Sequence, residues 1–253
     1  MGKASREIRI GTSGWFYDHW RGKFYPDKLA KNKWFEHYAE HFDTVELNNT
    51  FYRLPKEKTV QNWHAKAPKG FVFVVKANRY ITHIKRLKDT AEEVKRFFGV
   101  MDLLGGNLGP VLYQLPPSMQ KDHDLLESFI KLLPKRRIAV FEFRHKSWYE
   151  ADTLELLDNR GVGFCVHDMA GKETPKVVTG DLIYVRFHGT SGRYAGNYTD
   201  KMLQDWAKWI KENSEGVRGI YAYFNNDIGG HAINNARTLM NLMGVSSRIS
   251  GCG

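Results

Sequence analysis

Cysteine and long apolar runs are scarce in this sequence. Two cysteines in 253 residues, Cys165 and Cys252, are too few for a disulfide framework, so we expect free thiols in a reducing compartment. The longest strongly apolar run, residues 71–75, is far shorter than the roughly 18 residues that span a bilayer. Residues 1–10 also lack the apolar segment of a signal peptide. The chain is therefore predicted to be cytoplasmic, with no membrane partner.

The motifs of several common enzyme classes are absent. The turn after the first expected strand, residues 11–15, reads Gly-Thr-Ser-Gly-Trp and lacks the G-x-G-x-x-G spacing of a dinucleotide-binding fold. No Gly-rich phosphate loop and no G-x-S-x-G elbow occurs, which argues against an NTPase and an α/β-hydrolase. No H-x-E, H-E-x-x-H or C-x-x-C spacing occurs either, so we expect no cofactor; a divalent metal stays open.

Acidic residues are fewer than basic residues in this sequence. The chain has 38 Lys and Arg against 28 Asp and Glu, a net charge of +10. A basic surface attracts phosphates and nucleic acids, although it can also serve solubility alone. With 42% hydrophobic residues the chain is rich enough in apolar side chains to exclude a disordered protein.

The pattern that is present is an alternation of short β-rich runs with amphipathic helices. The expected strands are residues 7–11, 44–47, 71–76, 110–114, 138–143, 162–166, 182–187 and 220–224. The clearest expected helices are residues 33–42, 91–104, 122–133, 199–210 and 232–243, with Thr199 as an N-cap and Gly244 just after the last helix. Eight such units predict an α/β fold, a (β/α)8 TIM-type barrel. We expect one domain over residues 1–253, with a core from about 7 to 244 and a loose tail at 246–253.

Polar and ionisable side chains gather where the expected strands end. In a TIM-type barrel these ends form one rim, where ligands bind. Side chains alternate along a strand, so Tyr184, Arg186 and His188 share one face, as do Glu142 and Arg144. If those faces point inward, the mouth carries both signs of charge, and its charges must be paired or hydrogen-bonded.

We assign these rim residues two kinds of role. Acid–base chemistry is assigned to Glu46, Glu142, His188 and Asp227. Contacts to an anionic substrate are assigned to Trp15, Asn48, Tyr52, Lys76, Arg79, Gln114, Arg144, His145, Trp148, Arg186, Asn225 and Asn226. The same charges could instead pair with one another and plug the barrel, and the aromatic residues could belong to the core.

The rim segments also carry a family resemblance. They are residues 11–15, 46–52, 75–76, 81–83, 114–117, 142–148, 186–189 and 221–227, and in this order they resemble the YecE-like family, domain-of-unknown-function family 72. The resemblance implies a TIM-type barrel and supplies no reaction. Some members are similar in shape to the endonuclease IV barrels, which suggests nucleic-acid or phosphate handling. The three-zinc ligand pattern of that group does not map onto this chain.

Three functional hypotheses follow. The first is a basic barrel mouth that binds a phosphate-bearing ligand, above all DNA or RNA, with phosphodiester hydrolysis as its activity if the protein is an enzyme. The second is an enzyme that acts on a small phosphorylated or carboxylated metabolite. The third is a non-catalytic adaptor whose mouth is plugged by salt bridges.

Overall fold

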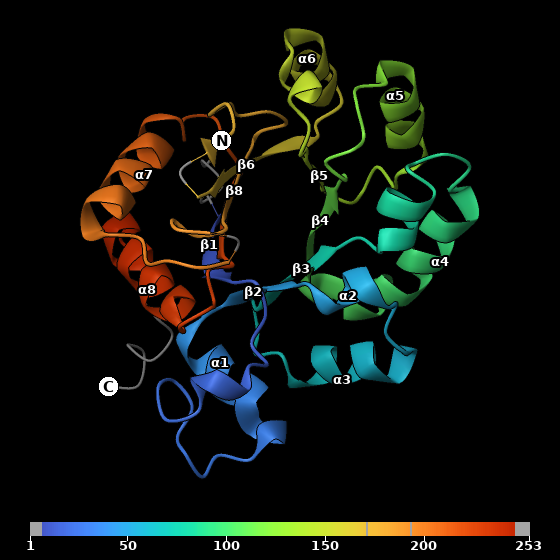
Figure 1. The fold of residues 1–253 in the computed structure, drawn as a ribbon. Helices are drawn as coiled ribbons and strands as arrows, with labels where there is room; N and C mark the ends of the chain where they lie inside the picture. Colours follow the sequence, from blue (N-terminus) through green and yellow to red (C-terminus); the bar gives the residue numbers. More distant parts are fainter. Residues whose placement is uncertain (1–6, 171, 193, 246–253) are drawn as a thin grey trace, which may run out of the picture.

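The computed structural model describes residues 7–170, 172–192 and 194–245, which form a nearly closed barrel of eight parallel strands with helices outside it (Figure 1). The predicted (β/α)8 TIM-type barrel is therefore confirmed. The tail at 246–253, with Cys252, lies outside the described residues. No helix in the described part of the chain is long and apolar enough to cross a bilayer.

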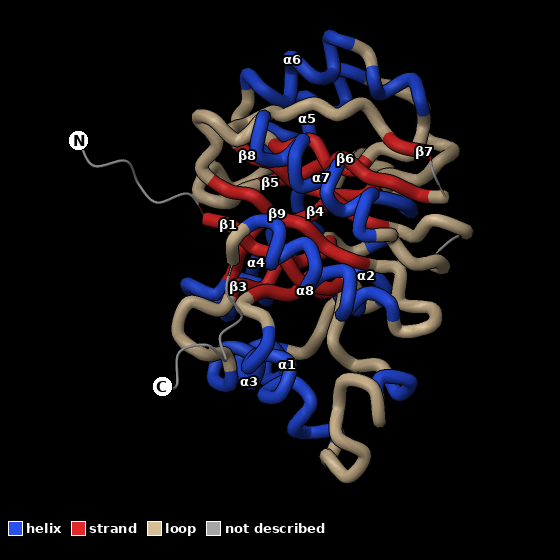
Figure 2. The backbone as a smooth tube through the Cα atoms, turned by 90° about the vertical axis from the view of Figure 1, so that its left-hand side faces the viewer, coloured by secondary structure: helices blue, strands red, loops and turns tan. Residues whose placement is uncertain are grey.

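The barrel strands match the eight predicted runs closely. They are β1 (Glu7–Thr12), β2 (Thr44–Leu47), β3 (Val72–Lys76), β4 (Leu108–Gln114), β5 (Ala139–Glu142), β6 (Gly163–Met169), β8 (Leu182–Phe187) and β9 (Gly219–Phe224). Around the barrel the order is β1-β9-β8-β6-β5-β4-β3-β2. A short strand that the sequence did not predict, β7 (Lys172–Glu173), pairs antiparallel with the end of β6. The strands form the central layer of the molecule, with helices flanking them (Figure 2).

Five of the α-helices were predicted from apolar spacing. They are α1 (Trp34–His41), α4 (Ala91–Met101), α5 (His123–Leu132), α7 (Asp200–Glu212) and α8 (His231–Met243). Thr199 caps α7 by accepting a hydrogen bond from the Met202 amide, and Gly244 ends α8 with a φ of 70°. The others are α2 (Asn49–Tyr52), α3 (Glu57–Lys66) and α6 (Ala151–Asn159). In α3 only Val60 is buried, so its sequence carries little apolar periodicity.

Alternate strand residues form two separate apolar layers. Those that face the helices join the large outer core. Those that face the barrel axis form a smaller core of Val74, Leu112, Val140, Cys165, Leu182, Tyr184, Tyr221 and Tyr223. Two residues farther along β3, β4, β5, β6 and β8 stand Lys76, Gln114, Glu142, His167 and Arg186. The charged residues of the mouth thus form the next layer above this inner apolar core.

The tyrosine Tyr38 of α1 closes the seam between β1 and β2, which share no backbone ladder. Its hydroxyl accepts hydrogen bonds from the Thr12 amide (3.1 Å) and the Thr12 hydroxyl (3.0 Å) and donates to the Thr44 carbonyl (3.0 Å). Gly11 allows this approach, because a Cβ there would lie 2.6 Å from the Thr44 carbonyl oxygen. One side-chain oxygen therefore replaces the missing backbone hydrogen bonds.

We predict that Tyr38→Phe destabilises the protein by about 1–3 kcal/mol, because it leaves the buried Thr12 amide and Thr44 carbonyl without this partner. Urea unfolding measures the change. Tyr113→Phe is the matched control, since the buried Tyr113 hydroxyl has no hydrogen-bond partner among the described residues and its removal should be neutral or stabilising. An equal decrease in the free energy of unfolding in the two variants would show that the contact between β1 and β2 does not depend on the Tyr38 hydroxyl.

Candidate functional site at the barrel mouth

A buried arginine bridges two buried carboxylates across the barrel. Nη2 of Arg186, on β8, lies 2.6 Å from Oε1 of Glu46 on β2. Its Nη1 lies 2.5 Å from Oε2 of Glu142 on β5. All three side chains are at most 1% exposed. Such charges tolerate burial only when each is paired, and here one guanidinium serves both carboxylates.

Each carboxylate has further partners of its own. Glu46 accepts hydrogen bonds from the hydroxyls of Ser13 (2.7 Å) and Tyr184 (2.6 Å). Glu142 pairs with Arg144, and its Oε1 lies 3.0 Å from Nε2 of His188. Two carboxylates and two guanidiniums therefore neutralise one another beneath the mouth.

The electrostatics of this network fix its protonation. Burial alone would raise the pKa of Glu142, but Arg144 and Arg186 outweigh it and hold that pKa well below the ordinary 4.5. Burial and the Arg186 charge lower the pKa of His188 well below its usual value, so this imidazole is neutral. Burial likewise lowers the pKa of His167, on β6, to about 4.

Lys76, at the end of β3, is buried but stands apart from these pairs. Its Nζ donates to Oε1 of Gln114 at 2.7 Å and lies 4.3 Å from the ring centre of Phe51. Within the described residues no carboxylate oxygen lies within 4.0 Å of this amine. Burial, followed by the charge of Arg186, lowers the pKa of Lys76 from 10.5 to about 7.

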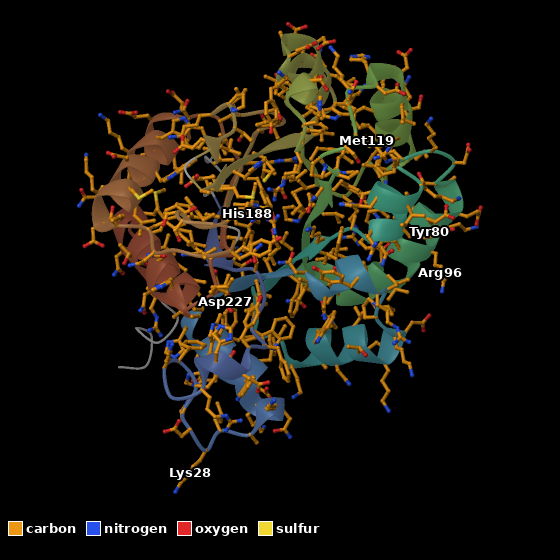
Figure 3. The ribbon with its side chains drawn as sticks, viewed as in Figure 1. Lys28, Tyr80, Arg96, Met119, His188 and Asp227 are labelled. Atoms are coloured by element: carbon orange, nitrogen blue, oxygen red, sulfur yellow. The ribbon has the colours of Figure 1, made fainter. Side chains whose placement is uncertain are left out.

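A cavity of about 350 Å³ lies over this network. Its lining residues come from the loops after β1, β2, β8 and β9 and from the end of β3: Tyr17, His19, Asn48, Tyr52, Lys76, Tyr194, Asn225, Asp227 and Ile228. His188 lies near the middle of the ring of strands, and Asp227 lies closer to its edge (Figure 3). The barrel mouth thus holds a hollow with a buried amine in its wall.

Asp227 faces this cavity from the loop after β9. Its Oδ1 accepts a hydrogen bond from the Trp20 indole at 2.5 Å, and its Oδ2 lies 2.6 Å from Nε2 of His19. Burial raises the pKa of Asp227 despite these partners. A carboxyl group with a neighbouring imidazole can exchange protons with a bound ligand.

The structure brings together most of the predicted site residues, on two levels. Glu46, Glu142, Arg144, Arg186 and His188 form the network beneath the cavity. Asn48, Tyr52, Lys76, Asn225 and Asp227 line the cavity itself, and Gln114 holds Lys76. The predicted arginine contact Arg186 is 1% exposed, so it supports the floor and does not reach a ligand.

Two predicted aromatic contacts belong to the outer core instead. Trp148 is fully buried, stacks on Phe143 at 4.8 Å and donates its indole N–H to the Met119 carbonyl. Trp15 packs on Phe35 and on other aromatic rings outside the barrel. Neither lines the cavity, because the turns after β1 and β5 direct these side chains toward the helix layer.

Three predicted polar contacts also lie off the cavity. Asn226 is buried and donates to the Gly196 carbonyl and to Asn235, so it ties loops together. His145 accepts a hydrogen bond from the Ser147 amide at the start of a short helix (Lys146–Tyr149). Arg79 is exposed just before the π-helix Tyr80–Ile84.

Sequence reasoning missed two residues that line the cavity, His19 and Ile228. No periodicity indicates which way these side chains point, because they lie outside the strands and the long helices. Tyr17 and Tyr194 also line the cavity, and the sequence places both at the rim. A second omission is the group His37, Glu40 and His41 on α1, whose ligand atoms all lie within 4.8 Å of one another. Its spacing is H-x-x-E-H, which is the reverse of the H-E-x-x-H motif that the sequence lacks. The Arg237 guanidinium contacts Nδ1 of His41 at 3.0 Å.

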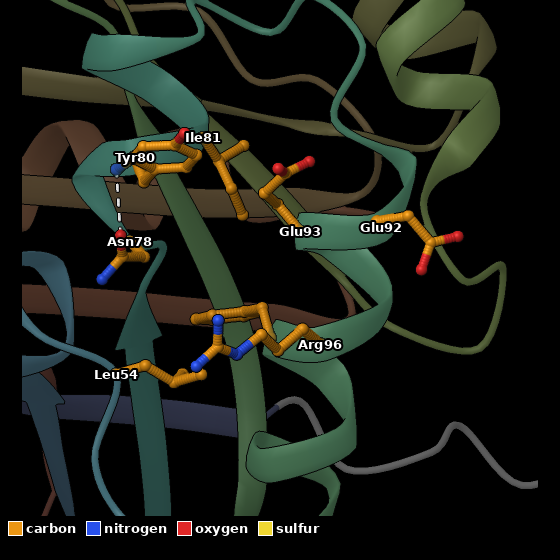
Figure 4. A pocket seen from close by; sticks show the side chains of 8 residues that line it. Leu54, Asn78, Tyr80, Ile81, Glu92, Glu93 and Arg96 are labelled. Carbon is orange, nitrogen blue, oxygen red and sulfur yellow. Dashed lines mark hydrogen bonds between the residues drawn. The ribbon is translucent and has the colours of Figure 1, made fainter.

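A larger cavity lies outside the barrel, between the π-helix and α4. It measures about 570 Å³ and is lined by Leu54, Asn78, Tyr80, Ile81, Glu92, Glu93, Arg96 and Phe97 (Figure 4). Its ionised groups are ordinary surface charges; Glu93, for example, pairs with Lys85 at 2.8 Å. Cavity size therefore does not single out the mouth, whereas buried charge and a displaced pKa favour it as the functional site.

The fold and the mouth define the class of protein: a TIM-type barrel with a charged, hydrogen-bonded site at the C-terminal ends of its strands. The family follows from the sequence match. Residues 9–250 match the family described as protein of unknown function DUF72, and the chain belongs to this family. The predicted resemblance is confirmed.

Similar proteins match between 61% and 94% of the chain. The UPF0759 protein YunF of Bacillus subtilis (strain 168) is 28% identical over 271 residues, 94% of this chain and 95% of YunF. The UPF0759 protein YecE of Escherichia coli (strain K12) is 31% identical over 61% of this chain and 55% of YecE. A crystal structure of a DUF72 family protein from Thermotoga maritima MSB8 matches with a TM-score of 0.85 at 30% identity, covering 94% of this chain and 100% of that one.

We predict that Arg186→Met lowers the free energy of unfolding by about 3–5 kcal/mol, because it leaves Glu46 and Glu142 buried without their shared partner. Urea unfolding at neutral pH measures the loss. Lys201→Met, which breaks an exposed pair with Asp205 on α7, should change it by less than about 1 kcal/mol. An Arg186→Met protein as stable as the wild type would contradict the bridged network.

We also predict that Glu142→Gln flattens the acid dependence of stability. The folded-state pKa of Glu142 lies well below 4.5, so the stability that its charge contributes is present above about pH 4.5 and lost as the pH falls through the folded-state value. The variant should have a lower free energy of unfolding than the wild type at pH 7. That free energy should also decrease less than the wild-type value when the pH is lowered. Urea unfolding between about pH 5 and pH 3 gives the slopes. The exposed Glu155→Gln should keep the wild-type slope.

Proposed function

We propose that the mouth cavity binds a small anionic metabolite, with Lys76 as its cationic contact. One observation supports this above all: the two guanidiniums beneath the cavity are already neutralised by Glu46 and Glu142, whereas Lys76 pairs with no carboxylate in the described part of the chain. A carboxylate or phosphate group on a ligand would supply the missing countercharge. This supports the second of our three hypotheses.

The dimensions of the site also support a small ligand. About 350 Å³ falls at the lower end of the range for small-molecule pockets. Amide groups of Asn48 and Asn225 and the hydroxyls of Tyr17, Tyr52 and Tyr194 supply hydrogen-bond partners around it. A nucleic-acid backbone needs a series of accessible cations along a groove. The arginines predicted for that role, Arg144 and Arg186, are engaged with Glu142.

Nucleic-acid binding, with phosphodiester hydrolysis as its activity, is the second candidate. The observation in its favour is the net charge of +10, together with two exposed arginines, Arg53 directly after the cavity residue Tyr52 and Arg79 three residues after Lys76. Such binding would use the outer rim and leave the cavity free. It would weaken steeply with added salt, because each phosphate contact releases counterions.

We predict that wild-type protein binds oxalate, measured by isothermal titration calorimetry, and that Lys76→Met weakens this at least about tenfold through loss of a charge-assisted contact. Affinity should fall as the pH rises above about 7, because the amine loses its proton there and the bound anion favours the charged form. The exposed α4 lysine variant Lys95→Met should bind as the wild type does.

The same titrations with single-stranded and duplex oligonucleotides separate the two candidates. Oligonucleotide binding that falls steeply with salt, persists in Lys76→Met and is lost in an Arg53→Ala/Arg79→Ala variant would replace the metabolite proposal. Oxalate binding that is unchanged in Lys76→Met, or absent from the wild type at pH 6.5, would overturn it.

A further inference from the structure

The amine of Lys76 is held in one position at the cavity wall. The Gln114 amide that accepts from it is itself oriented, because its Nε2 donates to the Leu115 carbonyl at 3.2 Å. The backbone carbonyl of Lys76 accepts a hydrogen bond from the Thr50 hydroxyl at 2.6 Å, which ties helix α2 and the adjoining turn to the end of β3. Asn78 donates to the Thr50 carbonyl at 3.0 Å and fixes the same helix. The amine is thus held by its contact with Gln114 at a point that borders the cavity.

Helix α2, held in this way, places an aromatic ring against the amine. Phe51 follows Thr50, and its ring centre lies 4.3 Å from Nζ of Lys76. The lysine is 7% exposed, so its amine has little contact with water although it borders the cavity. Desolvation next to other cations is the usual way in which proteins activate a lysine as a nucleophile.

The charges around Lys76 come from several elements. They are Glu46 of β2, Glu142 of β5, Arg144 after β5, Arg186 of β8 and His83 of the π-helix. The two carboxylates favour the ammonium form, while burial and the two arginines favour the neutral amine. Burial and arginine prevail and lower the pKa of Lys76 to about 7, so about half of this side chain is neutral at pH 7.

We infer that Lys76 forms an imine with the carbonyl carbon of a small oxo acid bound in the mouth cavity. This inference rests on the proposed function and specifies its substrate class. The neutral Nζ attacks the carbonyl carbon to form a carbon–nitrogen bond, and the carbonyl oxygen takes up a proton. That proton comes from the nitrogen and leaves a neutral carbinolamine. The carbinolamine hydroxyl then takes up a second proton and leaves as water, and a carbon–nitrogen double bond remains with one hydrogen and a positive charge on the nitrogen. No oxidant or reductant takes part.

The remaining lining groups match the needs of this step. Asp227 and His19, 2.6 Å apart, border the cavity and can deliver the proton with which the hydroxyl leaves as water. Asn48 and Asn225 border it too, and their amide groups can donate to the acid group of the ligand. The protonated imine keeps the positive charge at Nζ, so the attraction for the acid group persists after the bond forms.

The test is reductive trapping of the imine. Full-length protein is incubated with pyruvate and sodium cyanoborohydride between about pH 6 and pH 9, and peptide mass spectrometry locates the carboxyethyl-lysine product. We expect Lys76 to be modified at least about tenfold more at pH 7 than any other lysine, because burial lowers the pKa of its amine to about 7. The modification at Lys76 should rise as the pH increases through 7, and oxalate should suppress it.

Lys76→Arg is the matched variant, because it keeps the positive charge but cannot form an imine. We expect it to bind oxalate and to show no product at residue 76. Oxalate binding without pyruvate trapping in the wild type would overturn the imine and leave the anion site intact. Loss of both would overturn the proposed function as well. Equal modification of many lysines, unaffected by oxalate, would also refute a specific role for Lys76.

Discussion

One guanidinium that pairs with two carboxylates inside the barrel sets the geometry of the mouth. Arg186 reaches Glu46 on β2 and Glu142 on β5, so it links strands on different sides of the barrel. Charges this deeply buried destabilise a fold unless their partners are fixed. Here Ser13, Tyr184, Arg144 and His188 supply the remaining hydrogen bonds. The cavity therefore rests on a rigid and nearly neutral floor, against which its lining groups keep their positions.

This floor explains why one lysine differs from the other cations at the mouth. Arg144 and Arg186 are paired with Glu142, so they disfavour a further positive charge nearby without being free to bind an anion themselves. Lys76 experiences that repulsion together with burial. The arrangement follows a general rule for active sites: the surrounding structure supplies the stability that an uncompensated group lacks, and the uncompensated group is the one available for chemistry.

The fold could be predicted from the sequence because its signals are periodic. Alternation within β8 places Tyr184, Arg186 and His188 on one face, and the structure shows Tyr184 in the inner core with the other two in the network above it. The same reasoning could not tell a ligand contact from a buried pair, because pairing depends on strands far apart in sequence. It also misplaced Trp148, since an aromatic residue after a strand can face either the mouth or the helix layer. Loop residues such as His19 had no periodic signal at all.

The seam that Tyr38 closes has a consequence for how the chain is assembled. The first strand, β1, forms its backbone ladder with β9, the last strand, from Glu7–Gly219 to Thr12–Phe224. During synthesis from the N-terminus, residues 7–12 have no ladder partner until residue 224 has left the ribosome. Pairings between such distant segments carry a high cost in loop-closure entropy and slow the folding of a domain. The order of the strands thus makes the pairing of β1 with β9 a late step in the completion of the barrel.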